Sequence, residues 1–183
     1  MAPAFKTRDG RVLTLRGLAC GDGPALQAFN AALSEASRSL FLPHAYDDET
    51  INEVIRRSET GKDYVVVVEA EDRIVGYGFL WEFEEAVPVL GIGLADEVQG
   101  QGVGRPLMEH LIEAARNTNR DGIELTTVPS NARAFVLYQN CGFIHTGDTD
   151  NIAGDGRVVR EHVLFLPLKP GAEAPERTFK PPV

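Results

Sequence analysis

A glycine-rich segment, Gln99–Gly104, is the part of the sequence whose residue types and spacing point most clearly to chemistry. It reads QGQGVG, and three glycines in five residues allow the backbone to approach a ligand closely and to turn its N–H groups toward it. A helical pattern follows directly, and a helix N-terminus presents unpaired N–H groups and the positive end of its dipole. This combination favours an anion, a pyrophosphate in particular, and Arg105 could add a charge-assisted contact.

The glycine spacing by itself leaves other ligands open. Gly100, Gly102 and Gly104 are spaced G-x-G-x-G, whereas a dinucleotide-binding loop requires G-x-G-x-x-G near an early strand and an acidic residue about 20 residues later. A P-loop requires G-K-[ST] at its end, and Gly104 is followed here by Arg105-Pro106. A glycine-rich turn that binds nothing is the remaining alternative.

The alternation of apolar and polar residues predicts the elements that must hold this loop in place. Period-two and β-branched segments predict strands, and apolar residues at helical spacing predict helices. The predicted strands cover residues 11–16, 64–68, 74–81, 87–94, 123–128, 142–146 and 158–168. The predicted helices cover residues 22–33, 47–58, 106–117 and 131–140. This order favours a mixed α/β domain, with a central twisted mixed sheet of about six to seven strands flanked by about four helices.

The chain has 183 residues, a length that fits one domain. We expect that domain to cover residues 1–168, and we expect residues 169–183, which contain four of the 11 prolines, to be a mobile C-terminal tail. No apolar run approaches the ~20 residues that span a bilayer, and the N-terminal residues show no secretory signal. Cys20 and Cys141 lack the spacing of a zinc site, so we expect no metal site, and reduced thiols in the cytoplasm.

The net charge of −9 bears on the class of partner. A protein that binds duplex nucleic acid needs a basic stripe, and no such run occurs in the sequence, so nucleic acid is not an expected partner. An acidic chain attracts cationic substrates such as amines, although net acidity can also serve solubility alone.

A second motif lies about 30 residues beyond the glycine-rich segment and narrows its ligand. The first motif is Gln99-x-x-Gly102-x-Gly104, and the second is Asn131-x-x-Ala134-x-x-Leu137-Tyr138-x-x-x-Gly142-Phe143. With both motifs in this order, the sequence resembles the GNAT superfamily of N-acetyltransferases over roughly residues 11–168. The resemblance implies the GNAT fold and an acyl-CoA-dependent transferase whose cosubstrate is acetyl-CoA and which needs no metal.

The resemblance also implies which residues bind coenzyme A. In the family, the strand before the loop diverges from its neighbour, and its exposed backbone binds the pantetheine arm. The loop amides hold the pyrophosphate, and an asparagine at the next strand-to-helix turn contacts the pantetheine, a position where Asn131 could equally serve as a helix N-cap. The cofactor-binding residues implied here are Ile92, Gly93, Leu94, Gln99, Gly100, Gln101, Gly102, Val103, Gly104, Arg105, Asn131 and Tyr138.

Tyr138 occupies the family's general-acid position. The resemblance implies that a primary amine attacks the thioester directly, that the tetrahedral intermediate collapses, and that the phenol donates a proton to the departing thiolate. The backbone N–H of Leu94 would polarise the thioester carbonyl. The alternative for Tyr138 is a core tyrosine on an amphipathic helix.

No general base carries over from the family. Some members place a glutamate early in the fourth strand, and the matching position here is Pro88. N-terminal acetyltransferases of the ribosomal type carry a glutamate on the fifth strand, and the matching position here is Thr126. Glu82 and Glu84 are the catalytic candidates nearest the substrate side, and a solvated acidic turn is their alternative.

The acceptor is expected to be a small-molecule amine or a peptide amine, and a homodimer is compatible with the family. Two rival functions remain. One is a non-catalytic acyl-CoA-binding or sensing module on the same fold, which the unassigned base favours and the presence of Tyr138 disfavours. The other is an ordinary nucleotide-binding α/β protein.

Overall fold

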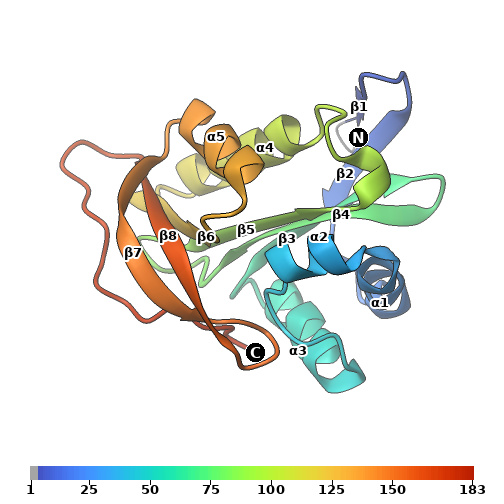
Figure 1. Ribbon diagram of the computed structural model, residues 1–183, viewed down its shortest axis with the longest axis horizontal. Helices are drawn as coiled ribbons and strands as arrows, with labels where there is room; N and C mark the ends of the chain where they lie inside the picture. The colour runs from blue at the N-terminus through green and yellow to red at the C-terminus, as the bar shows by residue number, and fades with distance from the viewer. Residues whose placement is uncertain (1–3) are drawn as a thin grey trace.

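A computed structural model describes residues 4–183, and in it a single twisted sheet runs through the molecule with helices on both faces (Figure 1). The eight strands are ordered β1-β2-β3-β4-β5-β6-β8-β7. Their bounds are β1 Ala4–Lys6, β2 Val12–Gly17, β3 Tyr64–Ala70, β4 Arg73–Trp81, β5 Val89–Leu94, β6 Gly122–Thr127, β7 Ile144–Ile152 and β8 Val158–Pro167. The helices are α1 Gly23–Ala32, α2 Glu35–Leu40, α3 Asp48–Glu59, α4 Gly104–Asn117 and α5 Ala132–Asn140, with a 3-10 turn at Asp96–Val98.

The predicted mixed α/β fold is confirmed, and two short elements add to it. Eight strands replace the expected six to seven, and five helices replace the expected four. The additional strand, β1, has three residues. The additional helix, α2, has six residues and buries none of them, so it carries no apolar stripe that a sequence pattern could reveal. Ser34 caps α2 by accepting a hydrogen bond from the Ser37 N–H at 3.2 Å.

The core forms where helices cover the central strands. α1 and α3 lie on one face of the sheet, and α4 and α5 lie on the other (Figure 1). α4 approaches β4 closely, because a Cβ at Gly78 would lie only 3.1 Å from Leu107 and 3.2 Å from Leu111. Both leucines are fully buried, which contributes on the order of 1.5–3 kcal/mol each. This packing fixes the position of the α4 N-terminus, where the glycine-rich segment ends.

The sheet opens between β5 and β6. These two strands run parallel and pair at one register position only, Val89 with Glu124. β4 and β5, by contrast, pair along all of β5, from Trp81 with Val89 to Gly76 with Leu94. The edge of β5 beyond Val89 therefore has no partner strand on the β6 side, and a gap follows.

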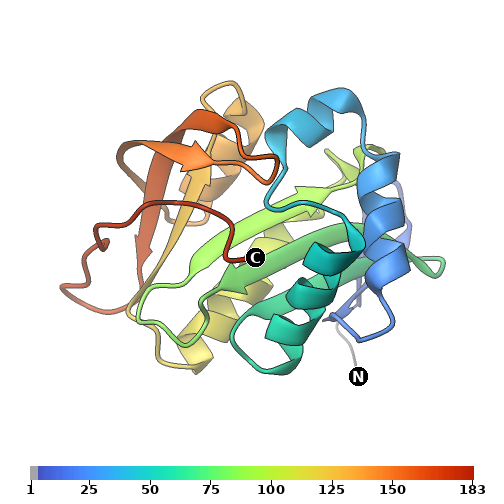
Figure 2. The same cartoon turned by 90° about the horizontal axis from the view of Figure 1, so that it is seen from below.

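Residues 169–183 form no helix or strand, but they contact the sheet (Figure 2). Figure 2 shows the chain end, in dark red, crossing in front of the strands toward the middle of the molecule. Phe179 is only 6% exposed, and its carbonyl accepts a hydrogen bond from the Ile152 N–H at 3.1 Å. The sequence pattern gave no sign of this contact, because one phenylalanine among prolines has no periodicity. Among residues 4–183, no helix is long and apolar enough to cross a membrane.

Candidate functional site

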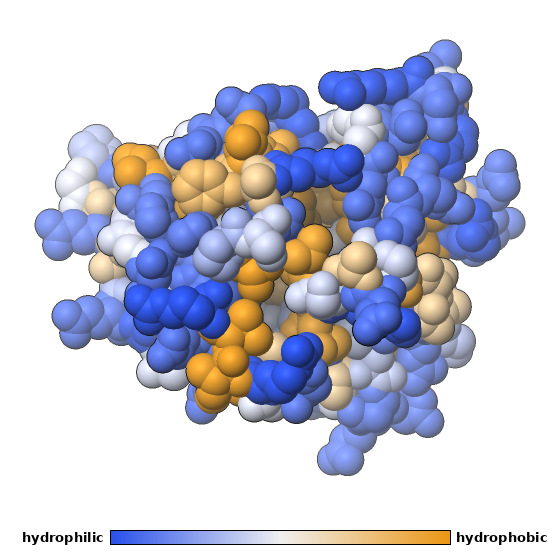
Figure 3. Space-filling view, in the orientation of Figure 1, coloured by the Kyte–Doolittle hydropathy of each residue, from blue (hydrophilic) through white to orange (hydrophobic). Residues whose placement is uncertain are grey.

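A cavity of about 650 Å³ occupies the gap between β5 and β6. The surface is hollowed near the centre of the face shown in Figure 3, and apolar side chains gather beside the hollow. β5, the glycine-rich segment, α2 and α5 supply most of the lining. The lining residues include Ser37, Phe41, Gly91, Ile92, Gly93, Leu94, Gln99, Gly100, Gly102, Val103, Gly104, Thr126, Asn131, Ala134, Leu137 and Tyr138.

The glycine-rich segment adopts the backbone that its glycines allow. Gly100 and Gly102 have φ values of +74° and +88°, in the left-handed region that other residues avoid. α4 starts at Gly104 with no side-chain cap, so the Gly104 and Arg105 N–H groups are available to a ligand. Val103, 1% exposed, anchors the segment in the core. The arrangement is a backbone cradle for an anion.

Gln99 and Asn131 fix the loops on which the cavity depends. The Gln99 side-chain amide donates to the Leu94 carbonyl at 3.0 Å and to the Ser37 hydroxyl at 3.0 Å, so it ties the loop to the end of β5 and to α2. Asn131 accepts a hydrogen bond from the Ala134 N–H at 3.3 Å and caps α5. Both side chains also line the cavity.

Two arginines that sequence reasoning missed border the cradle. Arg8 donates from its backbone to the Gln101 carbonyl at 3.0 Å and from its guanidinium to the Gly100 carbonyl at 3.2 Å. Arg133 lies 3.4 Å from the Gln99 side-chain oxygen. Both line the cavity, whereas the Arg105 side chain lies 3.5 Å from Glu109 and is not part of the lining. No sequence signal could have found Arg8, because it lies about 90 residues from the loop.

Tyr138 lines the same cavity from α5 and is 6% exposed. Burial raises the pKa of its hydroxyl well above the ordinary value, and the negative charge of Glu161 adds to this effect. The phenol is therefore protonated at neutral pH. No hydrogen bond joins its hydroxyl to another residue of the described chain, so it can donate to a ligand in the cavity.

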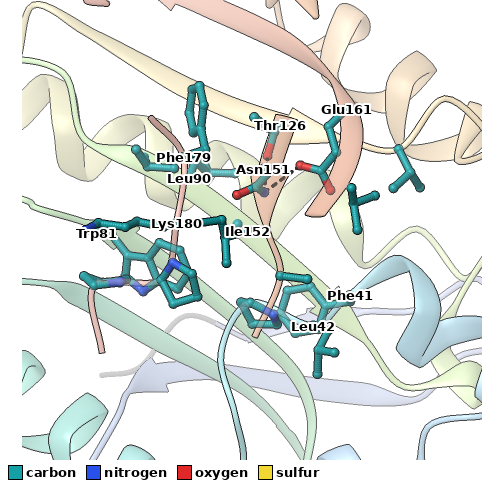
Figure 4. A pocket seen from close by; sticks show the side chains of 18 of the residues that line it. Phe41, Leu42, Trp81, Leu90, Thr126, Asn151, Ile152, Glu161, Phe179 and Lys180 are labelled. Carbon is teal, nitrogen blue, oxygen red and sulfur yellow. Dashed lines mark hydrogen bonds between the residues drawn. The ribbon is translucent and has the colours of Figure 1, made fainter. Parts of the chain in front are cut away.

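A second cavity of about 260 Å³ adjoins the first (Figure 4). The two cavities share Leu40, Phe41, Gly91 and Thr126, so they meet where β5 and β6 diverge. Aromatic and aliphatic side chains form most of its walls. They are Phe41, Leu42, Phe79, Trp81, Leu90, Ile152 and Phe179.

Three polar side chains from neighbouring strands form one side of this second cavity (Figure 4). The Asn151 amide on β7 donates to the Glu161 carboxylate on β8 at 2.7 Å and to the Thr126 hydroxyl on β6 at 3.3 Å. Glu161 is a carboxylate near the junction that sequence reasoning missed. Only the strand order β6-β8-β7 brings these three residues together, and a sequence pattern does not reveal that order.

The two glutamates expected from the sequence differ in position. Glu82 lines the second cavity, and its carboxylate lies 3.6 Å from the Arg177 guanidinium. Glu84 is exposed and belongs to the lining of neither cavity, while its backbone carbonyl accepts a hydrogen bond from Arg120 at 2.6 Å.

His44 follows the lining residues Leu42 and Pro43 in the chain but does not itself line the second cavity. It is fully buried, and its ring nitrogens lie 2.6 Å from the Ala45 carbonyl and 3.2 Å from the Tyr77 hydroxyl. Burial lowers the pKa of His44 to about 4, so the ring is neutral at physiological pH. The turn after β7 packs directly on this loop, since a Cβ at Gly154 would lie 2.3 Å from the His44 backbone.

One histidine–carboxylate cluster lies outside both cavities. His145 and His162 hydrogen-bond to Asp148 at 3.1 and 2.6 Å on the β7–β8 hairpin. Their donor atoms lie within 4.8 Å of one another, close enough for a metal ion. The hydrogen bonds of both imidazoles lower the pKa of the Asp148 carboxyl.

Comparison with known proteins identifies the family to which this arrangement belongs. The family model described as Acetyltransferase (GNAT) family matches residues 26–143. The chain belongs to the GNAT acetyltransferase family. This confirms the resemblance inferred from the two motifs, and with it an acyl-CoA-dependent acetyltransferase at the level of the family.

Individual relatives are similar over different lengths. The chain is 33% identical to the uncharacterized N-acetyltransferase YvbK of Bacillus subtilis over 75 residues, which is 40% of this chain and 48% of that protein. It is 29% identical to the 5-NmdU N-acetyltransferase of Pseudomonas phage PaMx11 over 115 residues, 61% of this chain and 79% of the phage protein. The chain therefore spans about half the length of the first relative and more of the second.

A solved structure shows the same fold. The putative acetyltransferase yncA of Salmonella typhimurium, determined with its cofactor acetyl-CoA, superimposes with a TM-score of 0.69 at 21% identity. The superposition covers 88% of this chain and 96% of that one. Acetyl-CoA is thus a ligand that this fold accommodates.

Proposed function

We propose that this protein transfers an acetyl group from acetyl-CoA to a primary amine by direct attack of the amine on the thioester. The observation that carries this proposal is the meeting of the two cavities at Gly91 and Thr126. One cavity has the backbone cradle of a coenzyme A site. The other has apolar walls and a carboxylate, which suit an organic ammonium ion.

Acetyl-CoA would lie along the open edge of β5. Its pyrophosphate would accept hydrogen bonds from the amides of Gly100–Arg105, and its pantetheine arm would pair with the backbone of Ile92–Leu94, which has no strand partner on that side. The guanidinium groups of Arg8 and Arg133 would attract the phosphates. Asn131 would contact the arm from the start of α5.

We propose that the Leu94 N–H polarises the thioester carbonyl. The next N–H, that of Ala95, donates to the Val75 carbonyl at 2.9 Å and so points toward β4. Because successive N–H groups of a strand point to opposite edges, the Leu94 N–H points toward the cavity. A donor there stabilises the negative charge that forms on the carbonyl oxygen during attack.

Tyr138 would serve as the general acid. When the tetrahedral intermediate collapses, the C–S bond breaks, its electron pair goes to sulfur, and the phenol donates its proton to the thiolate. Burial keeps the Tyr138 pKa high, so the proton is present when it is needed. The phenolate then regains a proton from solvent.

The attacking amine must lose a proton, and we propose Glu161 as the carboxylate that receives it, directly or through a water molecule. The Asn151 hydrogen bond at 2.7 Å holds this carboxylate beside Thr126 at the junction of the cavities. Glu82 is the second candidate, because it lines the same cavity. Glu84, the other expected residue, would act only through water.

Thiol release with DTNB, measured with acetyl-CoA and a panel of amines, amino acids, polyamines and peptides, tests the proposal. We expect amine-dependent release of coenzyme A with at least one class of acceptor. A protein that binds acetyl-CoA tightly but releases no thiol with any amine would instead be the acyl-CoA-sensing module.

A further inference from the structure

The C-terminal segment Arg177–Pro182 is attached to the sheet by its backbone and by charge. The Ile152 N–H donates to the Phe179 carbonyl at 3.1 Å, and the Arg177 guanidinium donates to the Val87 carbonyl at 2.6 Å. These contacts join the end of the chain to β7 on one side and to the segment just before β5 on the other. A segment without helix or strand thus has fixed partners on two sides of the second cavity.

A buried ion pair anchors the same segment. The Arg177 Nε lies 2.9 Å from the Glu124 carboxylate, whose side chain is only 2% exposed. Neither the Arg177 Nε nor the Glu124 Oε2 has a hydrogen-bond partner in the described chain. The charge of each is therefore compensated by the other. Burial raises the Glu124 pKa, and Arg177 opposes that shift. Releasing the segment would remove the Arg177 guanidinium from this carboxylate, so the ion pair favours the docked arrangement.

The docked segment forms one wall of the second cavity. Arg177–Pro182 lines it together with Trp81 and Leu90, and Phe179 lies next to Leu90 in Figure 4. Trp81 is itself held by stacking on Phe79 at a ring distance of 4.1 Å. The cavity thus has an apolar body bounded by the chain end and a polar side at Glu161 and Asn151.

From this geometry we infer that Arg177–Pro182 determines acceptor specificity: it restricts the acceptor to a small primary amine with an apolar or aromatic body, and it excludes polypeptide N-termini. This rests on the proposed acetyl transfer. The amine would lie beside Glu161, and the apolar body would lie between Trp81 and Phe179. The volume of about 260 Å³ is just below the range typical of small-molecule sites, roughly 300–1,000 Å³. A peptide is too large for this volume and would extend past its walls, one of which is the docked segment.

The test compares 2-phenylethylamine with an alanine-initiated hexapeptide as acceptors for the full-length protein, the Phe179→Ala variant and a chain ending at Lys169. Glu173→Gln, an exposed change in the same tail, is the control. We expect the wild type and the control to prefer the small amine by about 100-fold or more in kcat/KM. Phe179→Ala should raise the KM for phenylethylamine about tenfold with little change in kcat. It should therefore reduce the preference for phenylethylamine over the hexapeptide.

Two further measurements do not depend on turnover. Hydrogen exchange of the Ile152 amide reports docking, and we expect it to be slower in the wild type than in the chain ending at Lys169. Calorimetric titration of both acceptors into the coenzyme A complex reports acceptor class. Equal Ile152 exchange in both chains, or binding of the hexapeptide as tight as that of phenylethylamine, would overturn the inference. Selective binding of phenylethylamine without any thiol release would overturn the proposed reaction while supporting the acceptor class.

Discussion

The two cavities that meet at Gly91 and Thr126 are built in different ways. The cavity beside the glycine-rich loop, which we propose holds the donor (the donor cavity), is built mainly from backbone: the open edge of β5, the amides of a six-residue loop and the start of a helix. The second cavity, which we propose holds the acceptor (the acceptor cavity), is built from side chains of distant segments, including Trp81, Glu161 and Phe179. Recognition by the backbone requires particular residues, above all glycine, at fixed spacing. Recognition by side chains allows the residue type at each position to vary between proteins. This contrast explains why the residues of the first cavity form a family motif, and why we propose that the second cavity determines what an individual member acts on.

Tyr138→Phe should have the largest effect, because the phenol is the proposed general acid. Removal of the hydroxyl leaves the thiolate without its proton donor and should lower kcat by about 10²–10⁴-fold. The affinity for acetyl-CoA should change little, because the ring and its packing are retained. Steady-state kinetics and calorimetry check the two parts separately. A decrease in kcat below about threefold would remove Tyr138 from the reaction.

Glu161→Gln tests the acceptor side of the junction. The amide retains the size and hydrogen bonding of the side chain but cannot accept the proton of an ammonium ion, so kcat at neutral pH should fall about 100-fold. Part of the loss should be recovered at higher pH, where more of the amine is already neutral. Asp150→Asn, an exposed change on the same hairpin, is the matched control. A greater loss in Glu82→Gln than in Glu161→Gln would assign the proton acceptor to Glu82.

Gly102→Val tests the donor side alone. A β-branched residue at φ +88° is strained by about 1–2 kcal/mol, and adjusting the loop to relieve the strain turns its amides away from the pyrophosphate. We expect the acetyl-CoA Kd to rise at least about tenfold, which corresponds to 1.4 kcal/mol.

Gly61→Val is the control for this change, because Gly61 has a similar φ of +76° and open space around it, in the turn after α3. It should lower the melting temperature by a similar amount and leave the Kd unchanged. Equal acetyl-CoA affinity in both variants would mean that the glycine-rich loop does not hold the donor.

The smallest expected effect is on stability and comes from the protonation of His44, in the loop next to the acceptor cavity. Its pKa of about 4 in the folded protein lies below the ordinary value of 6.5, so the unfolded chain binds the proton first as the pH falls. Stability that is present above about pH 6.5 is therefore lost toward pH 4, by about 2 kcal/mol at pH 5. Urea unfolding at pH 7 and pH 5 measures this loss. His44→Gln should show a smaller difference between the two pH values, and an unchanged difference would assign the acid sensitivity to other groups.

Most of the architecture could be predicted from the sequence, because strand and helix periodicity reflects which face each residue buries. The backbone conformation of the glycine-rich loop could also be predicted, because Gly100 and Gly102 adopt positive φ values that other residues avoid. Glu161, Arg8 and Phe179 could not, because their positions depend on strand order and on contacts between residues far apart in the chain. The expected cytoplasmic location and homodimer stay predictions.

The most direct test of the account is one reaction: wild-type protein, acetyl-CoA and 2-phenylethylamine, with both products quantified. We predict that free coenzyme A thiol and N-acetylated amine form in equal amounts. In Tyr138→Phe, both products should form at no more than about 1% of the wild-type rate. Tight binding of acetyl-CoA without amine-dependent thiol release, across small amines and peptides alike, would contradict the account.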